Sequence, residues 1–481
     1  MGLLGIVLGL ALLVGLAFRG WSVLLLAPIA ALVAALFSGE PLLAHWTQTF
    51  MGSAAHFLAQ FFPLFLLGAL FGKLMEDSGS VTVIADAMIK KLGQGRAVLA
   101  VVLAGAIVTF GGVSLFVAFF VLAPMAAQVF RAADVPRRLM PAAIALGTST
   151  FTMSAFPGTP SIQNAIPMPF FGTTPFAAPG LGILASIIML VFGMAWLGRV
   201  EAAARKAGEG FGGMATAGNT DAGGLRERAA TAHEFDTAEL SRGAQSTSAP
   251  SLWLAALPLV VVILVNMAMS LVILPRLDLA YLAEPRFGET SLAGVGGVWA
   301  VITALASAIV VVLAINFRRL PAVRATIDAG ANASVLPVLS VASLVGFGAV
   351  VAAMPAFQIV SDWVLGIGGG PLVSLAAATN ILSALTGSAS GGLTIALDAL
   401  GPTYLERAAA IGMDPALLHR VAVMASGTLD SLPHNGAVVT LLAVCGVSHR
   451  EGYRDIVMVG IVGAMIALVA VILLGGLFGS F

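Results

Sequence analysis

The segment from Ala97 to Phe130 contains no Asp, Glu, Lys, Arg or His, and the pair Gly111-Gly112 lies near its middle. A straight helix of this length would be about 51 Å long, whereas the hydrocarbon core of a bilayer is about 30 Å thick. The segment is therefore too long for one ordinary crossing and too short for two full ones. Basic residues flank it on both sides, namely Lys90, Lys91 and Arg96 before it and Arg131, Arg137 and Arg138 after it. If both clusters face the cytoplasm, the segment enters the membrane and turns back, which predicts a re-entrant helical hairpin of the kind found in ion-coupled transporters.

The composition is that of a membrane protein. Of the 481 residues, 59% are hydrophobic and only 10% are charged, and the mean hydropathy is +1.02. No soluble core needs so much apolar sequence, so we expect a polytopic helical protein embedded in lipid. The net charge of zero gives no reason to expect a nucleic-acid partner. Cys445 is the single cysteine, which excludes an intrachain disulfide and a multi-cysteine metal site.

Apolar runs predict the membrane segments, and the first of them is expected to be a retained helix rather than a cleaved signal peptide. The predicted spans are 2–18, 21–37, 57–72, 139–170, 181–198, 251–274, 291–316, 334–360, 419–447 and 456–480, with hairpins at about 97–130 and 366–400. Residues 199–250 are rich in Gly, Ala, Ser and Thr mixed with charges. This composition is typical of a flexible, solvated linker, here cytoplasmic. The linker separates a first membrane repeat, 1–198, from a second, 251–481.

The positive-inside rule supports both hairpins. With the N-terminus outside and both hairpins returning to their own side, all but four of the 23 Lys and Arg residues face the cytoplasm. The four outside are Arg276, Arg286, Arg407 and Arg420. A pair of short full spans in place of a hairpin gives the same count, so only the shortness of the arms favours re-entry.

The two halves follow the same pattern. In the first, the hairpin broken at Gly111-Gly112 is followed by an uncharged helix, about 139–170, that contains Pro157. In the second, the polar run from Thr386 to Thr394, which contains Gly391-Gly392, predicts the corresponding break, and a helix at about 419–447 contains Pro433. We therefore expect an all-α membrane protein of two inverted-topology repeats, each with a re-entrant hairpin and a broken helix, whose breaks meet near the midplane.

Polar runs coincide with these four breaks and predict the binding site. Proline and glycine free backbone groups that lipid cannot satisfy, so the unwound stretches must face protein or a wet cavity. Half-helix N-termini and hydroxyls suit the oxygens of a carboxylate or a hydroxy acid. Isolated hydroxyls in membrane helices usually serve packing, but the dense run from Thr148 to Asn164 favours cavity lining. The candidate substrate-binding residues are Gly111, Gly112, Ser114, Thr148, Ser149, Thr150, Ser154, Pro157, Gly158, Thr159, Thr386, Ser388, Ser390, Gly391, Thr428, Ser431 and Asn435.

Few ionisable residues lie at membrane depth. Asp430 and His434 are the candidates for proton coupling, although they could instead cap or brace the break at Pro433. We expect Asp398, His56 and His419 to be interfacial, and Glu40, Glu76 and Asp77 to be solvated loop charges. No fixed cationic side chain is expected at the midplane, so dipoles and hydroxyls would hold an anionic substrate. Either H⁺ or Na⁺ could be the coupling ion, and we expect no cofactor and no metal site.

The run Leu146-Gly147-Thr148-Ser149-Thr150-Phe151-Thr152, followed by Phe156-Pro157-Gly158-Thr159-Pro160, resembles the gluconate permease (GntP) family of bacterial carboxylate:H⁺ symporters, within the ion transporter superfamily. Ser431-Leu432-Pro433-His434-Asn435-Gly436 is the counterpart in the second half. Some relatives resemble permeases for 3-hydroxybutyrate. The resemblance implies a homodimeric protein of the bacterial inner membrane, with a dimerising scaffold and a mobile transport domain that works as an elevator.

Other functions remain open at this point. The hairpin tips, Gly111 to Ser114 and Ser388 to Gly391, lack the Ser-Asn-Thr motifs of the sodium-coupled dicarboxylate branch of the superfamily, which disfavours a citrate-like sodium symporter. An intramembrane serine protease would need a serine and histidine pair such as Ser390 and His434, but the nucleophile-elbow spacing is absent. A channel usually repeats its pore elements by oligomeric symmetry. We therefore expect a secondary transporter rather than an enzyme.

Overall fold

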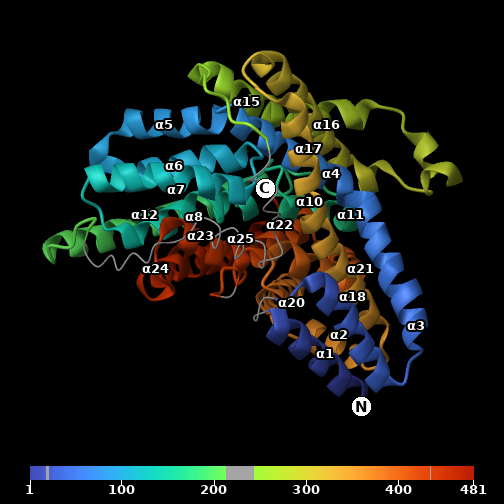
Figure 1. The fold of residues 1–481 in the computed structure, drawn as a ribbon. Helices are drawn as coiled ribbons and strands as arrows, with labels where there is room; N and C mark the ends of the chain where they lie inside the picture. The colour runs from blue at the N-terminus through green and yellow to red at the C-terminus, as the bar shows by residue number, and fades with distance from the viewer. Residues whose placement is uncertain (18–20, 213–242, 434) are drawn as a thin grey trace.

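The computed structural model describes residues 1–17, 21–212, 243–433 and 435–481, and all regular secondary structure in these ranges is helical (Figure 1). A helix satisfies its own backbone hydrogen bonds, which is what a chain buried in lipid requires. Seven helical stretches among the described residues are long and apolar enough to cross a membrane, namely Leu42–Asp77, Leu115–Ala132, Pro179–Lys206, Leu252–Arg276, Leu292–Asn316, Val323–Ala353 and His449–Phe478. The chain is therefore built as a multi-pass helical membrane protein.

One set of helices, called here the framework group, packs around α4 and α18. Helix α2 packs on α1 and α18, while α4 packs on α16, α17 and α18. A π-helical turn, His45–Phe50, and the short α3, Leu42–Ala44, join α4 at its beginning without a break. The framework group consists of α1 (Gly2–Ala17), α2 (Val23–Ser38), α4 (Met51–Asp77), α15 (Leu252–Ala268), α16 (Leu292–Asn316), α17 (Val323–Ala333) and α18 (Val335–Ala353).

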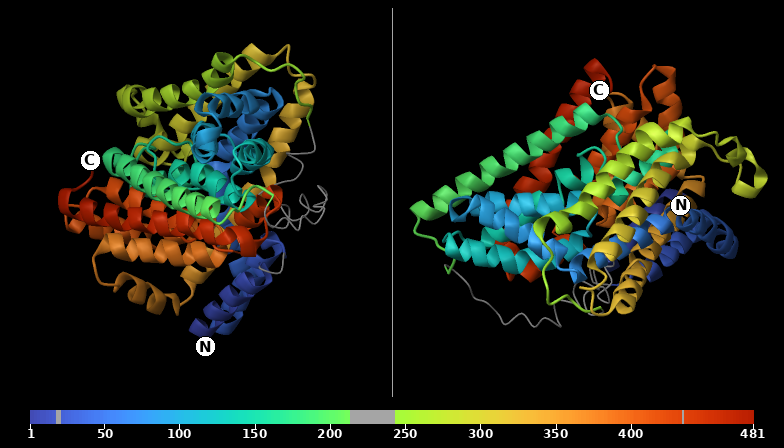
Figure 2. Two further views of the ribbon diagram at one scale, coloured as in Figure 1. Left: turned by 90° about the vertical axis from the view of Figure 1, so that its left-hand side faces the viewer. Right: turned by 90° about the horizontal axis from the view of Figure 1, so that it is seen from above.

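The arms of the two hairpins, the broken helices and the helices that follow them form a second set, called here the hairpin group. Figure 1 shows α6 and α7 lying side by side with α5 next to them, and Figure 2 shows α12 running along the C-terminal helices. The two groups meet where α21 packs on α18 and where α11 packs on α16. The hairpin group consists of α6 (Ala97–Phe110), α7 (Leu115–Ala132), α8 (Met140–Thr148), α9 (Phe151–Ser154), α10 (Ile162–Ala165), α11 (Pro167–Phe171), α12 (Pro179–Lys206), α20 (Pro371–Thr386), α21 (Ala389–Ala410), α22 (Pro415–Ser426), α23 (Gly436–Cys445), α24 (His449–Ile456) and α25 (Gly463–Phe478).

Both predicted hairpins correspond to pairs of helices joined by a tight turn. Between α6 and α7 the chain turns through Gly112, whose φ of 95° is accessible to glycine and strained for other residues. Between α20 and α21 it turns at Gly387, with a φ of 63°. This turn lies within the predicted polar break, Thr386 to Thr394, whereas Gly391 and Gly392 of that run lie in the first turn of α21. A Cβ atom on Gly392 would lie 2.3 Å from the backbone of Ser383, so this glycine lets the two arms pack closely.

The helices containing Pro157 and Pro433 are both interrupted. The first is divided into α8, α9, α10 and α11, with unwound residues 155–161 between α9 and α10. The second is divided into α22 and α23, separated by residues 427–435. His434 lies outside the described residues.

Three helices were not expected from the apolar runs because their sequences are amphipathic. They are α5 (Ser80–Leu92), α17 (Val323–Ala333) and α19 (Phe357–Leu365). Helix α5 carries Asp86, Lys90 and Lys91, and α19 carries Gln358 and Asp362, so neither stands out as an uninterrupted apolar segment. Helix α5 precedes the first pair of arms and α19 precedes the second.

The expectation that Glu76 and Asp77 are solvated loop charges is wrong. Helix α4 continues to Asp77, and both carboxylates are buried with Lys73, whose Nζ lies 3.2 Å from Glu76 and 3.1 Å from Asp77. Thr326 of α17 donates a hydrogen bond of 2.6 Å to Asp77 Oδ2. The backbone N–H of Ser246 donates to the Asp77 carbonyl at 2.7 Å, so the end of the predicted linker covers this cluster.

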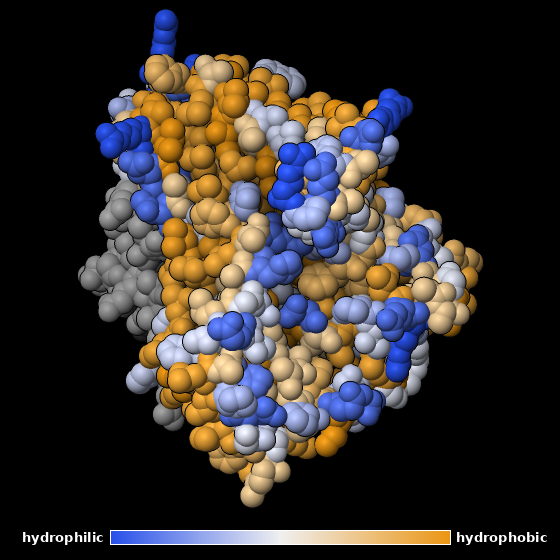
Figure 3. Space-filling model, turned by 90° about the vertical axis from the view of Figure 1, so that its right-hand side faces the viewer, coloured by the Kyte–Doolittle hydropathy of each residue, from blue (hydrophilic) through white to orange (hydrophobic). Residues whose placement is uncertain are grey.

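The predicted linker begins later than expected, because α12 continues to Lys206. After it, Glu209 accepts hydrogen bonds of 2.7 and 3.0 Å from Arg138, and this contact lowers the pKa of the Glu209 carboxyl. Arg138 also pairs with Asp455 of α24 at 3.1 Å. Residues 213–242, the centre of the predicted linker, lie outside the described residues. The face in Figure 3 is largely apolar, with hydrophilic side chains gathered at its edges and around a central hollow.

Candidate functional site

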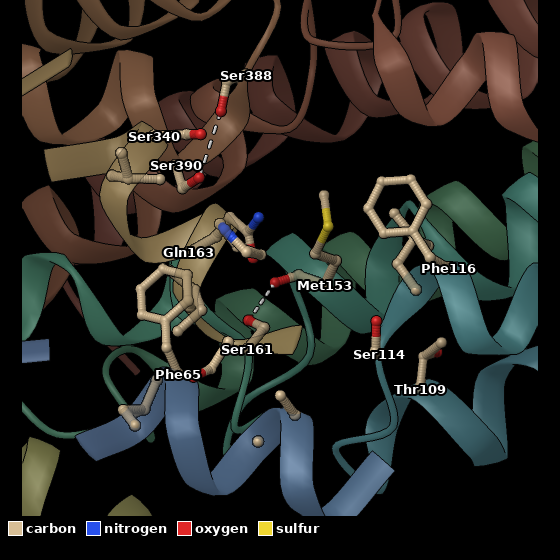
Figure 4. Close-up of a pocket in the computed structure, with 18 of the residues that line it drawn as sticks. Phe65, Thr109, Ser114, Phe116, Met153, Ser161, Gln163, Ser340, Ser388 and Ser390 are labelled. Atoms are coloured by element: carbon tan, nitrogen blue, oxygen red, sulfur yellow. Dashed lines mark hydrogen bonds between the residues drawn. The ribbon is translucent and has the colours of Figure 1, made fainter. Parts of the chain in front are cut away.

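A cavity of about 270 Å³ lies between the framework group and the two hairpin tips (Figure 4). The tips contribute Gly112 to Phe116 from the first hairpin, and Thr386 to Ser388 together with Ser390 from the second. The first broken helix, Thr109 of α6, and framework residues of α2, α4, α17 and α18 complete the lining. Hydroxyl and amide groups supply its polarity, and none of the described lining residues is Asp, Glu, Lys, Arg or His. The polar lining residues are Thr109, Ser114, Thr148, Thr152, Ser161, Gln163, Ser334, Ser340, Thr386, Ser388 and Ser390.

Two helix N-termini begin at this cavity. Helix α7 starts directly after Ser114, and α21 starts directly after Ser388, and both serines line the cavity. The first N–H groups of a helix lack intrahelical acceptors and carry the positive end of its dipole. Two such termini at one uncharged cavity favour an anionic group, such as a carboxylate, without any cationic side chain.

The unwound backbone of the first broken helix is held in place by side chains from other helices. Arg420 of α22 donates to the carbonyl of Ala155 at 3.0 Å and twice to the carbonyl of Ala177, at 3.1 and 2.6 Å. Asn266 of α15 donates to the carbonyl of Gly158 at 3.0 Å. These buried donors satisfy carbonyls that the helix break has freed, which lipid could not do.

Two neighbouring residues of α22 are buried inside the protein. The Arg420 side chain is completely buried beside the first break. The reason is that the carbonyls of Ala155 and Ala177 converge on its guanidinium. His419, expected to be interfacial, is also completely buried.

His419 links α22 to the loop that follows the first break. Its Nε2 lies 3.2 Å from Asn164 Oδ1, and its Nδ1 lies 2.6 Å from Thr173 Oγ1. The Nδ2 amide of Asn164 donates to the carbonyls of Thr159 and Pro175, both at 3.0 Å, so its Oδ1 is left to accept. This pattern assigns the proton of His419 to Nε2, with Nδ1 accepting from the Thr173 hydroxyl.

A second, smaller cavity of about 60 Å³ adjoins the first. Its lining includes Ser149, Asp430, Ser431 and Asn435, and it shares Leu115, Met153, Gln163 and Ser390 with the larger cavity. Ser431 Oγ donates to Asp430 Oδ1 at 3.2 Å. The smaller cavity therefore places a carboxylate next to the larger, uncharged one.

Asn435 links the second broken helix to the tip of the second hairpin by a hydrogen bond. Its Nδ2 donates to the carbonyl of Gly387 at 2.7 Å, and its Oδ1 accepts from the N–H groups of Ala437 and Val438 at 2.7 and 3.2 Å. One side chain thus caps α23 and holds the turn between α20 and α21.

The predicted site residues divide by location. Six line the larger cavity, namely Gly112, Ser114, Thr148, Thr386, Ser388 and Ser390, and Ser149, Asp430, Ser431 and Asn435 line the smaller one, together with Ser390. The others line neither of these two cavities, namely Gly111, Thr150, Ser154, Pro157, Gly158, Thr159, Gly391 and Thr428. Several of these donate their hydroxyl hydrogen bond to a backbone carbonyl four residues earlier in the chain. Thr150 donates to Leu146, Ser154 to Thr150 and Thr428 to Met424.

Sequence reasoning did not select six polar residues that line the larger cavity. Thr109, Thr152, Ser161 and Gln163 belong to polar runs at the breaks, and their place in those runs was the available signal. Ser334 and Ser340 lie in or beside an apolar framework helix, where nothing distinguishes them from packing serines. Among the described residues, no group of three or more His, Cys, Asp or Glu side chains is arranged to hold a metal ion.

The chain matches the model of the GntP family permeases over residues 1–209. It is 39% identical over 486 residues to the transporter YxjC of Bacillus subtilis (strain 168), with 99% of this chain and 100% of YxjC covered. Over 162 residues it is 30% identical to the high-affinity gluconate transporter of Escherichia coli (strain K12), with 33% of this chain and 35% of that protein covered.

Two solved transporter structures share the fold. The YdaH transporter of Alcanivorax borkumensis matches with a TM-score of 0.53 and 16% identity, over 91% of this chain and 88% of that chain. MtrF of Neisseria gonorrhoeae matches with a TM-score of 0.53 and 14% identity, over 91% of this chain and 85% of that chain. The family model, the full-length relative and the apolar helices agree: the chain belongs to the GntP family of permeases and is a multi-pass membrane transporter.

Proposed function

We propose that this protein carries a small hydroxy-monocarboxylate, of the gluconate or 3-hydroxybutyrate type, into the cell together with a proton across the bacterial inner (plasma) membrane. The observation that carries the proposal is the uncharged, hydroxyl-lined cavity at the N-termini of α7 and α21. Helix termini would hold the carboxylate, and the hydroxyls and Gln163 would pair with the substrate's hydroxyl groups. The gluconate transporters among its relatives support this substrate class.

Asp430 is the proposed proton carrier. It lines the smaller cavity, and four residues line both that cavity and the larger one. An ionisable group inside a membrane protein is costly to keep unless it has a function, and a carboxylate can gain and lose a proton during a transport cycle. A proton on Asp430 would offset the negative charge of the bound substrate. His434 stays a candidate for the same role on the basis of the sequence.

We propose that the two halves are inverted repeats and that the hairpin group moves against the framework group. The order of elements supports this proposal, because an amphipathic helix, two paired arms, a broken helix and a closing helix follow α4 and again follow α18. Both hairpins would be re-entrant, with tips at the central cavity. The framework group would remain fixed in the lipid and form the contact of a homodimer, as the family resemblance implies.

The test uses the purified protein in liposomes with an imposed pH gradient, acidic outside, and a panel of gluconate, 3-hydroxybutyrate, lactate and citrate. We expect saturable uptake of a hydroxy-monocarboxylate that a protonophore abolishes and that a sodium gradient does not drive. Uptake that responds to neither gradient would contradict symport. Sodium-driven uptake of citrate would contradict both the substrate class and the coupling ion.

A further inference from the structure

Ser340 of α18 differs from the other hydroxyl groups that framework residues present to the larger cavity. Its side chain is 5% exposed, it lines the cavity, and its Oγ has no hydrogen-bond partner among the described residues. Ser334, the neighbouring lining serine, instead donates to the carbonyl of Ala331 at 2.7 Å. A buried hydroxyl without a partner destabilises the protein unless a ligand or water pairs with it.

Ser340 faces the tip of the second hairpin. Figure 4 shows its hydroxyl beside Ser388 and Ser390, whose own oxygens lie 3.3 Å apart. The start of α21 is packed tightly on α18, because a Cβ atom on Gly391 would lie 2.4 Å from Leu344 Cδ1. Three hydroxyls from two different helix groups therefore gather at one end of the cavity.

The framework residues that line the cavity lie between the basic ends of their helices and the helix middles, which Leu64 of α4 and Leu344 of α18 mark. Val23 follows Arg19 in the sequence, Ala69 precedes Lys73, and Ser334 follows the basic segment that ends with Arg324. The positive-inside rule places these basic residues on the cytoplasmic side. The cavity thus lies beside the cytoplasmic half of the framework group, which is the position expected when the site faces the cell interior.

From these observations we propose that Ser340 is a substrate contact that exists only while the cavity faces the cytoplasm. This inference rests on the proposed function. Because Ser340 belongs to the framework group, it does not travel with the hairpin group, and the substrate loses this hydrogen bond when the site faces outward. Its ligand is a hydroxyl or carboxylate oxygen of the bound acid.

The inference predicts a one-sided change in affinity. Right-side-out and inside-out membrane vesicles give the KM at the outer and cytoplasmic faces, with the acid that the wild-type protein transports as the probe. For Ser340→Ala we expect the cytoplasmic KM to rise about three- to ten-fold, as for the loss of one hydrogen bond, while the outer KM stays unchanged. Ser340→Thr retains the hydroxyl and restores the cytoplasmic KM.

Ser307→Ala of α16 is the matched control, because its hydroxyl donates to the Thr303 carbonyl at 2.8 Å and it lines neither cavity, so it leaves both KM values unchanged. An equal rise in KM at both faces for Ser340→Ala, or no rise at either face, would overturn the inference. Absence of saturable, gradient-driven transport by the wild-type protein would instead contradict the proposed function. The two failures are therefore distinguishable.

Discussion

In the first broken helix, side chains from other helices hold the unwound backbone, whereas the second break is braced mainly from within its own region of the chain. Arg420 and Asn266 reach the first break from α22 and α15. At the second break, Asn435 caps the helix that follows it, and Tyr453 of α24 donates to the carbonyl of Ser431 at 3.3 Å.

The two breaks also differ in the groups they present to the cavities. The first contributes Thr148, Thr152, Ser161 and Gln163 to the larger cavity, all uncharged, whereas the second contributes Asp430 to the smaller one. An uncharged cavity lining, whose backbone is held by hydrogen-bond donors from other helices, suits the recognition of an anion. A carboxylate next to that lining suits a group that changes its protonation during the cycle. Under the proposed function, substrate recognition would belong to the first break and proton coupling to the second.

The largest expected effect comes from removing the brace of the first break. Arg420→Met leaves the buried carbonyls of Ala155 and Ala177 without their donor, and each such group costs about 1–3 kcal/mol. We expect destabilisation of roughly 2–5 kcal/mol by the same principle, measured as a lower melting temperature of the purified protein in detergent. Arg407→Met is the control, because Arg407 is exposed and donates to the Leu365 carbonyl near the surface. Similar melting temperatures for the two variants would show that the first break does not depend on its external brace.

The next effect concerns the charge of the second break. Asp430→Asn keeps the size of the side chain but removes the carboxylate that we propose gains and loses a proton. We expect accumulation driven by a pH gradient to fall at least about ten-fold, while counterflow exchange of labelled substrate continues. Asp398→Asn of α21, which lines neither of the two cavities, is expected to retain both activities. Equal loss of accumulation and exchange in Asp430→Asn would point to a role in folding or binding.

A smaller expected effect is a difference in KM between variants of two threonines in the first broken helix. Thr148 lines the larger cavity, whereas the buried Thr159 lines neither cavity, so Thr148→Val should raise KM about two- to ten-fold and Thr159→Val should not. Uptake kinetics in liposomes measure both values. Unchanged KM in both variants would remove the hydroxyl of Thr148 from the binding site.

The smallest effect concerns the ion pair that links the segment before the first broken helix to the segment after the second. Arg138 precedes the first and pairs with Asp455, which follows the second, and also with Glu209. Since this contact lowers the pKa of Glu209 below its ordinary value of 4.5, its stabilisation is present above that pH and is lost as the pH falls through the lowered pKa. Glu209→Gln should therefore lower the melting temperature slightly at pH 7 and not at all in sufficiently acidic buffer. A difference from wild type that does not depend on pH would rule out the ion pair as its cause.

The sequence predicts the helical class and the hairpins because long uncharged segments with basic flanks have few alternatives in a membrane. It places the second break between Thr386 and Thr394 but does not show which glycine of that run makes the turn, because glycine serves two purposes. Gly387 provides the turn with its positive φ, whereas Gly392 permits close contact with Ser383, and the local sequence does not separate these uses.

The cavity residues of the breaks were also predictable, since polar runs beside proline and glycine mark unwound backbone. Arg420 and His419 were not, because their burial depends on loops far away in the sequence, around Ala155 and Ala177 and around Asn164 and Thr173. Ser340 stands alone in an apolar helix, so only the assembled structure places it at the cavity.

The proposed movement of the hairpin group against the framework group can be tested with one disulfide. A Cβ atom on Gly72 of α4 would lie 3.8 Å from the Cβ of Ser114 at the first hairpin tip, a separation suited to a disulfide. In a Cys445→Ala background, Gly72→Cys with Ser114→Cys would link the two groups in the cytoplasm-facing position. Gly401→Cys with Phe170→Cys is the matched control, because its Cβ separation is also 3.8 Å and both residues lie within the hairpin group.

The decisive measurement is substrate uptake by each pair before oxidation, after oxidation and after reduction. We predict that oxidation stops transport by the Gly72 and Ser114 pair, that reduction restores it, and that the control pair transports in both states. Undiminished transport by the fully cross-linked Gly72 and Ser114 pair would contradict the account.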